Sequence, residues 1–456
     1  MSPARLFRTL VLCAGLVLGA AGGAQADTVT LTPEEMRAAA SYALEVHDNR
    51  LALSLAGALL QRDPRDGFAL IIKSRAARNL GDNATAKRAA RAAWRVARSD
   101  GDRYAAALVM AQALSSDGQR TWAQLWLRRA AQYAPDERSE ALIARDFRYV
   151  RSRNPWSMHL TFGVTPSSNI NNGSKSDTIV IGGIPFQLSG GAQALSGLEI
   201  NYGASTRYRR DVSERLSLHF GGSVEGKAYR LSESARRKAP GLRASDLAYR
   251  AAELQFGATL RGARPRNPLD VNLRLGKNFY GGDHLSDYAV AELAKTVTLG
   301  KRNRLRFTVS AEEQWRKDRA DRSSTALTSQ VDWSTRVGQS GLLQLSLGLR
   351  DTRSDSGTIA HSAQMAAVDY RFTKPVFGAY LGLSAAYETR DYDQALFGSG
   401  PRRDDKLSLG ATMFLPDYDY YGFAPEIGLS IVNNHSSETL YETEDIGLTL
   451  GFRSTF

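Results

Sequence analysis

Residues 269–276 read Leu-Asp-Val-Asn-Leu-Arg-Leu-Gly, so that apolar side chains alternate with charged, polar or small ones. The same period of two recurs in 216–225, 343–350 and 379–388. Since successive side chains of a β-strand point to opposite faces, each stretch predicts a strand with one apolar face and one charged face. A soluble sandwich would cover the apolar face with a second sheet. An outer-membrane barrel would present that face to lipid and the charged face to a wet lumen.

The segment around these stretches favours the barrel. Fourteen such segments can be placed in 154–456, and many are longer than the five or six residues usual in soluble sheets. The connections also alternate in length, with short ones near 211–214, 262–267, 300–303, 338–341 and 374–375, and long ones near 165–192, 231–245, 391–404 and 434–444. Short periplasmic turns and long external loops are typical of outer-membrane barrels. We therefore expect a 14-stranded antiparallel transmembrane β-barrel.

The last expected strand carries a further signal. Ile446, Leu448, Leu450 and Phe452 alternate with polar or small residues, and the sequence finishes at Phe456. An amphipathic strand that ends in an aromatic residue resembles the signal read by the barrel-assembly machinery, which we therefore expect as a partner during biogenesis. An even number of strands returns both barrel termini to one side, which we expect to be the periplasm.

Residues 27–153 have a different, helical composition, rich in Ala, Leu, Arg and Gln. Ala123, Leu127, Ala130 and Pro135 have the spacing of small and closing positions in a tetratricopeptide repeat. Two further sets precede them at related spacing, namely Ala52, Ala56, Leu59 and Pro64, and Ala86, Ala90 and Ala93. The pattern predicts an α-solenoid of tetratricopeptide-like helix pairs that binds protein on its concave face, and a generic α-solenoid is the alternative.

The first 26 residues predict an export signal, with Arg5 and Arg8 before an apolar run and an Ala-x-Ala motif at its end. Cys13, the only cysteine, lies inside it, which excludes disulfides and thiolate metal sites from the remainder. The formal charge is +12, and 27–153 holds 21 Lys and Arg against 15 Asp and Glu. For an exported protein, this favours anionic lipid or an acidic protein as partner over nucleic acid.

Enzyme motifs are absent from the sequence. None of the six histidines stands in H-E-x-x-H, and no G-x-S-x-G elbow occurs. We therefore expect no catalytic, cofactor-binding or metal-binding residues and no cofactor.

The order of segments resembles one known family. Asn154-Pro155 follows the helices, a strand comes next, and then Ser168-Asn169-Ile170-Asn171-Asn172 precedes a long barrel that ends in Phe. In these features the chain resembles the surface lipoprotein assembly modulator (Slam) family, although Ser167 stands where the family usually has an aspartate. The resemblance implies an outer-membrane protein that helps to move specific client proteins, lipidated or soluble, from the periplasm to the cell surface. It also implies that the periplasmic helices engage the client or a chaperone.

Alternatives stay open at this point. The barrel could instead be a passive porin or an exopolysaccharide-export channel. The Asn-rich string 168–172 could be loop chemistry, because Asn side chains bond their own backbone in turns, or it could bind a hard cation through its amide oxygens. A route through the lumen and a route through the seam between the first strand (about 156–164) and the last (about 445–456) are both compatible with the sequence.

Overall fold

The computed structural model describes residues 30–181, 183–397 and 400–454. The expected signal peptide (1–26) and Phe456 lie outside these ranges. The chain divides into two compact units, one up to Ala97 and the other from Arg98 to Phe456. Each unit is described by itself.

The first unit consists of helices with small residues in their interface. They are α2 (Pro33–Glu45), α3 (Asn49–Arg62), α4 (Gly67–Asn79) and α5 (Asn83–Val96). Acidic caps define where three of them start: the side chains of Asp48, Asp66 and Asp82 accept hydrogen bonds from the first-turn amides of α3, α4 and α5. The core contains the buried side chains of Ala40, Ala43, Ala52, Ala56, Ile72 and Ala76. Alanine allows helix axes to approach closely, which explains why the spacing of small residues could be recognised in the sequence.

The second unit begins with three more helices, α6 (Asp100–Ser116), α7 (Arg120–Gln132) and α8 (Glu137–Arg153). Ser99 and Asp102 form a capping box at the start of α6, and Asp136 caps α8. Across the described residues, no helix has both the length and the apolar character needed to cross a membrane. The chain leaves α8 at Arg153 and enters its first strand at Trp156.

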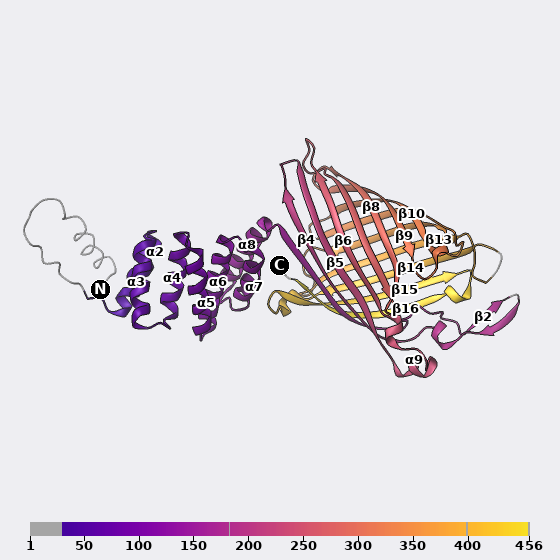
Figure 1. Cartoon of the computed structure of the whole chain (residues 1–456), viewed down its shortest axis with the longest axis horizontal. Coiled ribbons are helices and arrows are strands. Elements are labelled where there is room, and N and C mark those ends of the chain that lie inside the picture. Colours follow the sequence, from indigo (N-terminus) through magenta and orange to yellow (C-terminus); the bar gives the residue numbers. More distant parts are fainter. Residues whose placement is uncertain (1–29, 182, 398–399, 455–456) are drawn as a thin grey trace, which may run out of the picture. The chain divides into compact units, whose positions relative to one another are not determined.

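The rest of the second unit is a closed antiparallel barrel of 14 strands. In sequence order the barrel strands are β1 (Trp156–Ser167), β4 (Gly197–Asp211), β5 (Leu216–Leu231), β6 (Tyr249–Leu260), β7 (Leu269–Tyr280), β8 (Asp283–Leu299), β9 (Asn303–Arg316), β10 (Ser324–Val337), β11 (Gly341–Ser354), β12 (His361–Phe372), β13 (Tyr380–Tyr392), β14 (Arg402–Phe414), β15 (Phe423–Ser436) and β16 (Thr443–Ser454). Each strand pairs with its sequence neighbour, and β1 closes the barrel against β16 (Figure 1). The expected fold class, helices followed by a 14-stranded barrel, is confirmed.

The two faces of the wall differ as the alternation predicts. Outward-facing leucines are exposed in the isolated chain, for example Leu347 at 65% and Leu349 at 62%. The inward face carries ion pairs between strands, such as Arg306 with Asp270 at 3.0 Å. An apolar band of this extent is stable only against lipid. The rings of Trp156, Tyr208 and Phe220 cluster where β1 starts, with centroids 5.0–6.3 Å apart, as expected for an interface girdle.

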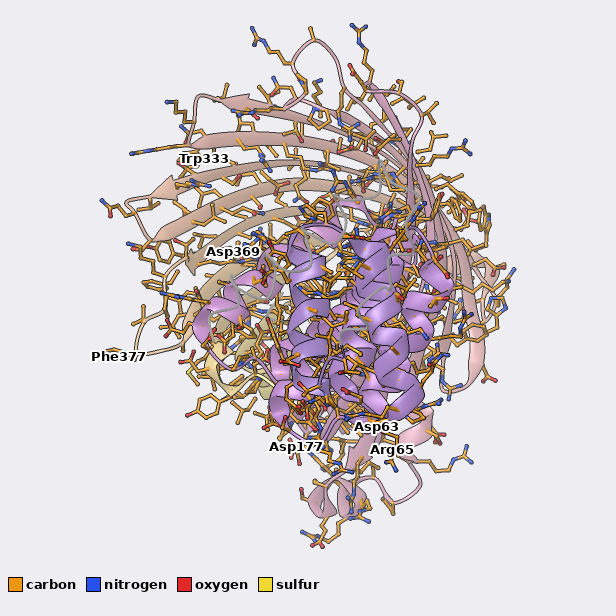
Figure 2. The ribbon with its side chains drawn as sticks, turned by 90° about the vertical axis from the view of Figure 1, so that its left-hand side faces the viewer. Asp63, Arg65, Asp177, Trp333, Asp369 and Phe377 are labelled. Atoms are coloured by element: carbon orange, nitrogen blue, oxygen red, sulfur yellow. The ribbon has the colours of Figure 1, made fainter. Side chains whose placement is uncertain are left out.

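The two barrel ends also differ. One end carries both barrel termini and the turns 212–215, 261–268, 300–302, 338–340, 373–379 and 415–422. Phe377, at the tip of one of these turns, is fully exposed with a φ of 51° (Figure 2). The other end carries the longest loops, 168–196 with the hairpin β2 (Thr178–Ile181) and β3 (Ile184–Gln187), and 232–248 with α9 (Glu233–Lys238) (Figure 1). By the rule for outer-membrane barrels, the first end is periplasmic and the second extracellular.

Candidate functional site at the barrel seam

The seam between β1 and β16 is paired over a shorter stretch than the neighbouring strand pairs. Its backbone partners are Gly163 with Gly451, Val164 with Leu450 and Ser167 with Gly447. On its other side, β1 pairs with β4 along its whole length, from Trp156 to Ser167. This register places Leu160 opposite Ser454, the last described residue of β16, so Trp156–His159 lie opposite positions outside the described residues. Among the described residues, the β1–β16 pair has fewer backbone partners than any other strand pair of the barrel.

At the extracellular end, one carboxylate holds the seam together. Asp445 of β16 accepts hydrogen bonds from the Ser167 hydroxyl (2.7 Å), the Ser168 hydroxyl (3.2 Å) and the Asn169 backbone amide (3.0 Å). The Ser168 hydroxyl in turn accepts the Ile446 amide at 2.9 Å. We call this group, Ser167 to Asn169 with Asp445, the seam latch. Bonds to a charged acceptor are stronger than neutral ones, so the latch compensates for the short backbone pairing.

The remaining residues of the 168–172 string fold the first extracellular loop. The Asn169 amide group bonds the Gly173 carbonyl and amide, each at 2.8 Å, and the Asn171 amide group bonds the Gly191 and Gln193 carbonyls and the Leu195 amide, each at 2.9 Å. Ile170 is buried with Leu195, Leu231, Ala235, Ala239 and Leu247, which lie in or beside the two long loops. The string is therefore a brace that ties both loops to the seam.

The brace also bears on the cation hypothesis. The side-chain oxygens of Asn169 and Asn171 already accept the amides of Gly173 and Leu195. These two oxygens therefore bond the loop backbone and do not point together toward a common cation position. Asn172 has a φ of 51°, a left-handed conformation that Asn tolerates in turns. The loop interpretation of these asparagines therefore has the stronger structural support.

At the periplasmic end, one helix contacts the end of β16 and the residue that precedes Pro155 and β1. The Thr121 hydroxyl of α7 accepts a hydrogen bond from the side chain of Asn154 (3.0 Å), two residues before β1. Seven residues further along α7, the Arg128 guanidinium donates to the Ser454 hydroxyl at the end of β16 (2.7 Å). It also donates to the Gly422 carbonyl before β15 (2.6 Å). The guanidinium carbon of Arg128, Cζ, also lies 4.7 Å from the centroid of the Phe423 ring. Helix α7 is therefore bonded to the chain just before β1 and to the last described residue of β16.

Further bonds reinforce this contact. The Tyr421 amide donates to the Gln132 side chain (2.8 Å), and the Tyr421 and Tyr133 hydroxyls are 3.2 Å apart. The bond to Tyr133 raises the pKa of Tyr421, and burial lowers the pKa of Arg128. Tyr421 has a φ of 52°, so the turn 415–422 is held in a specific shape where α7 meets it. The contact is a defined interface and more than a covalent linker.

The other predicted residues are placed as follows. Ala123, Leu127 and Ala130 are buried on α7, whereas Pro135 lies exposed between α7 and α8. Asn154 ends α8, and the Pro155 carbonyl accepts the Arg209 amide at 2.8 Å, so this pair starts the barrel at the end opposite to the 168–172 string. Ile446, Leu448, Leu450 and Phe452 lie on the outward face of β16, with Phe452 62% exposed.

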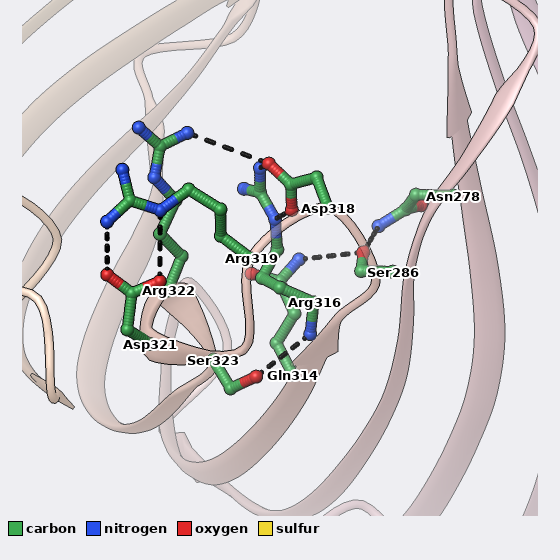
Figure 3. Close-up of polar contacts among 9 residues, drawn as sticks. All are labelled: Asn278, Ser286, Gln314, Arg316, Asp318, Arg319, Asp321, Arg322 and Ser323. Carbon is green, nitrogen blue, oxygen red and sulfur yellow. Dashed lines mark hydrogen bonds and ion pairs between the residues drawn. The ribbon is translucent and has the colours of Figure 1, made fainter.

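Arginines at the extracellular rim mostly have acidic partners. In the loop between β9 and β10, Arg316 and Arg322 both approach the Asp318 carboxylate, at 2.7 and 3.6 Å, and Arg319 approaches Asp321 at 2.5 Å (Figure 3). The hydrogen bond from Arg316 lowers the pKa of Asp318 to about 2. Ion pairs between residues of the same loop therefore stabilise its conformation.

Sequence reasoning missed Asp445, Arg128 and helix α9. Asp445 and Arg128 lie 276 and 326 positions from the residues they bind, Asn169 and Ser454, and nothing local marks such pairs. The α9 segment does have a signal, since Ser232-Glu233 before Arg236-Arg237-Lys238 is a capped helix start followed by a cationic end.

Comparison with known proteins gives one family. The model described as "Surface lipoprotein assembly modifier" matches residues 156–456. No match was found among curated protein sequences. Among solved structures, similar chains include a bacterial polysaccharide outer membrane secretin (9% identity, TM-score 0.32, covering 64% of this chain and 98% of the other), OpdQ of Pseudomonas aeruginosa (11%, 0.33, 66% and 99%) and OmpF of Salmonella typhi with daunomycin (10%, 0.36, 65% and 98%). At these TM-scores we draw no functional conclusion from them.

Proposed function

Because the chain belongs to the surface lipoprotein assembly modifier family, we propose that it assists the passage of specific client proteins from the periplasm to the cell surface. Family and barrel together make it an outer-membrane protein involved in surface lipoprotein assembly. The passage of individual clients, lipidated or soluble, is the part we propose. No catalytic step is part of the proposal.

The contact of α7 with Asn154, just before β1, and with Ser454 of β16 is the observation that carries this proposal. A diffusion pore has no need of a helix that bonds the start of β1 through Asn154 and the end of β16 through Ser454. In our proposal, residues 27–153 bind the client or its chaperone, and binding shifts α7. The excess of positive charge in 27–153 supports an acidic client surface.

The seam supplies a route. The described backbone pairs of β1 with β16 are limited to those of Gly163, Val164 and Ser167, and the latch at Asp445 holds the extracellular end. A barrel is closed by this one strand pair, so local opening there would expose a lateral path without unfolding the remaining wall. We propose that α7 controls the periplasmic half of the seam and that the latch limits how far the opening extends.

Cross-linking from intact outer membranes tests the proposal. Cells express the tagged full chain or a matched chain that lacks residues 27–153 behind the same signal, and cross-linked partners are identified by mass spectrometry. We expect one or a few exported proteins with the full chain and their loss with the truncated one. Proper insertion of both is checked by heat-modifiable electrophoretic mobility.

The alternative, a passive or exopolysaccharide-export channel, predicts a different result. Recovery of only the barrel-assembly machinery from both chains would contradict client passage. Altered glycan secretion or antibiotic uptake in a deletion strain, with surface proteins unchanged, would then favour the channel. The mixed charges on the inner wall, such as Arg350 with Glu312 at 3.2 Å, would suit such polar solutes.

A further inference from the structure

A groove lies on the outward face of the wall at the extracellular end of the seam. Its volume is about 570 Å³, and its lining includes Pro166, Leu198, Ile446, Arg230 and Arg236. The strand register explains this grouping, because Pro166 is opposite Leu198 and Leu198 is opposite Arg230. Across the seam, the Ser168 hydroxyl holds the Ile446 amide at 2.9 Å. The groove therefore spans β16, β1, β4 and β5.

Arg230 occupies an unusual position for a charged residue. Alternation along β5 places it on the same face as Leu218, Phe220 and Val224, which are 44–57% exposed and face lipid. An arginine on the lipid face is costly at the bilayer centre and nearly neutral at the interface. Arg230 is the next-to-last residue of β5, directly below the loop 232–248, so it lies at headgroup height in the outer leaflet.

A second arginine reaches the groove from α9. The helix is fixed over the groove because Ala235 and Ala239 pack in the cluster around Ile170 and Leu231, and Ser232 caps it by accepting the Ala235 amide at 3.1 Å. Arg236 is exposed on this helix. The packing thus holds a second guanidinium at the same rim.

Neither guanidinium has an anionic partner within the described part of the chain. The side chains of Arg230 and Arg236 make no ion pair or hydrogen bond there, whereas the rim arginines of the β9–β10 loop have Asp318 or Asp321 beside them (Figure 3). The acidic residue of α9, Glu233, lies 3.9 Å from Arg237 instead. Two such arginines above an apolar surface fit an anionic group that carries apolar chains.

We propose that this groove binds the phosphorylated headgroup of an outer-leaflet glycolipid with the chemistry of lipid A. Guanidinium groups bind phosphate through paired, charge-assisted hydrogen bonds, and Arg230 and Arg236 supply two of them. Below Arg230 the outward face is apolar, with Ile200 opposite Val164 and Val164 opposite Leu450, and takes the acyl chains. One bound lipid bridges both sides of the seam and so reinforces its extracellular end. This inference does not depend on the proposed function.

Native mass spectrometry of the full-length protein in detergent tests it. The probes are diphosphorylated lipid A, the same lipid with both phosphates removed, and phosphatidylglycerol, with inorganic phosphate as a free competitor. The variants are Arg230→Gln/Arg236→Gln and, with charge kept but the planar fork lost, Arg230→Lys/Arg236→Lys. The matched control is Arg237→Gln/Arg353→Gln, which removes two positive charges from the same rim outside the groove lining.

We expect wild type and control to retain diphosphorylated lipid A, the Gln pair to lose about tenfold in affinity, and the Lys pair to lie between them. The dephosphorylated lipid should bind as weakly as lipid A binds to the Gln pair, and phosphatidylglycerol, with one phosphate, should bind more weakly than lipid A. Equal retention by all variants would overturn the proposal. The proposal would also be overturned if millimolar inorganic phosphate displaced bound lipid A as strongly as free lipid A does. The groove would then be a simple anion site. If the Gln pair does not fold, unchanged binding by the Lys pair would overturn the proposal in the same way.

Discussion

Asn169 is the most deeply buried asparagine of the string 168–172. It is 6% exposed, and its side chain bonds Gly173 twice and the Glu444 carbonyl once. We predict that Asn169→Ala destabilises the barrel by about 1–3 kcal/mol, because buried backbone groups lose their partners. The measurement is the temperature at which heat-modifiable mobility is lost, together with protease cleavage of the loop 168–196.

The neighbouring Asn172 is the control for that substitution. It has a φ of 51° and no side-chain hydrogen bond to any of the described residues, so Asn172→Gly keeps the backbone conformation and removes no contact. It should behave like wild type. Equal destabilisation by both substitutions would show that the string acts through something other than the brace.

Asp66 makes the first unit sensitive to acid. Burial, the largest single influence, raises its pKa, but the Ala69 amide and the Arg37 guanidinium, 2.8 Å away, outweigh burial, and the net pKa is lowered. Because the pKa of Asp66 is lower in the folded state, its carboxylate contributes its full stabilisation above the pKa of the unfolded state, about 3.9. That contribution is lost as the pH falls through the pKa of the folded state. We predict that Asp66→Asn reduces the stability lost below pH 4, followed by helix circular dichroism on heating. Arg65→Gln, a nearby surface change, should retain the wild-type loss.

At the scale of the element, α7 links the helices to the wall through Arg128. Arg128→Ala removes the two hydrogen bonds that the charged guanidinium donates to Gly422 (2.6 Å) and Ser454 (2.7 Å). It also removes the contact with the Phe423 ring at 4.7 Å. We predict that α7 loosens by about 1.5–3 kcal/mol and that client display falls while the barrel stays folded. Hydrogen exchange at α7 and the end of β16 measures the first effect. Arg129→Gln, on the exposed side of the same helix, should change neither.

The elements differ in how far the sequence could reveal them. Strand number and the direction of each side chain could be predicted, because lipid requires an apolar residue at every second position, as in 343–350. The packing of the helices could be predicted in part, because Ala52 and Ala56 lie where helices touch and must be small. The seam latch and the α7 contact could not be predicted. They join Asn169 to Asp445 and Arg128 to Ser454, and only the closed barrel brings those residues together.

At the scale of the whole molecule, the two ends of the seam have different roles. Asp445 holds the extracellular end, and α7 contacts Ser454 and Asn154 at the periplasmic end. The other strand pairs of the barrel have longer continuous registers, for example β4 with β5 from Gly197 to Asp211. Such an arrangement confines any opening to one strand pair and to the side from which a client would enter.

A disulfide across the seam tests this confinement. Val164 and Leu450 are backbone partners on the outward face, so Val164→Cys/Leu450→Cys can be oxidised to join β1 and β16. Cys13, in the expected signal, is the only native cysteine. If clients pass through the seam, oxidation should abolish their surface display and a reductant should restore it. Ile200→Cys/Ala228→Cys, a partner pair across β4 and β5, is the matched control and should permit display in both redox states. Undiminished display with the seam disulfide fully formed would exclude the lateral route and leave the lumen as the path, with α7 then acting on its periplasmic entrance.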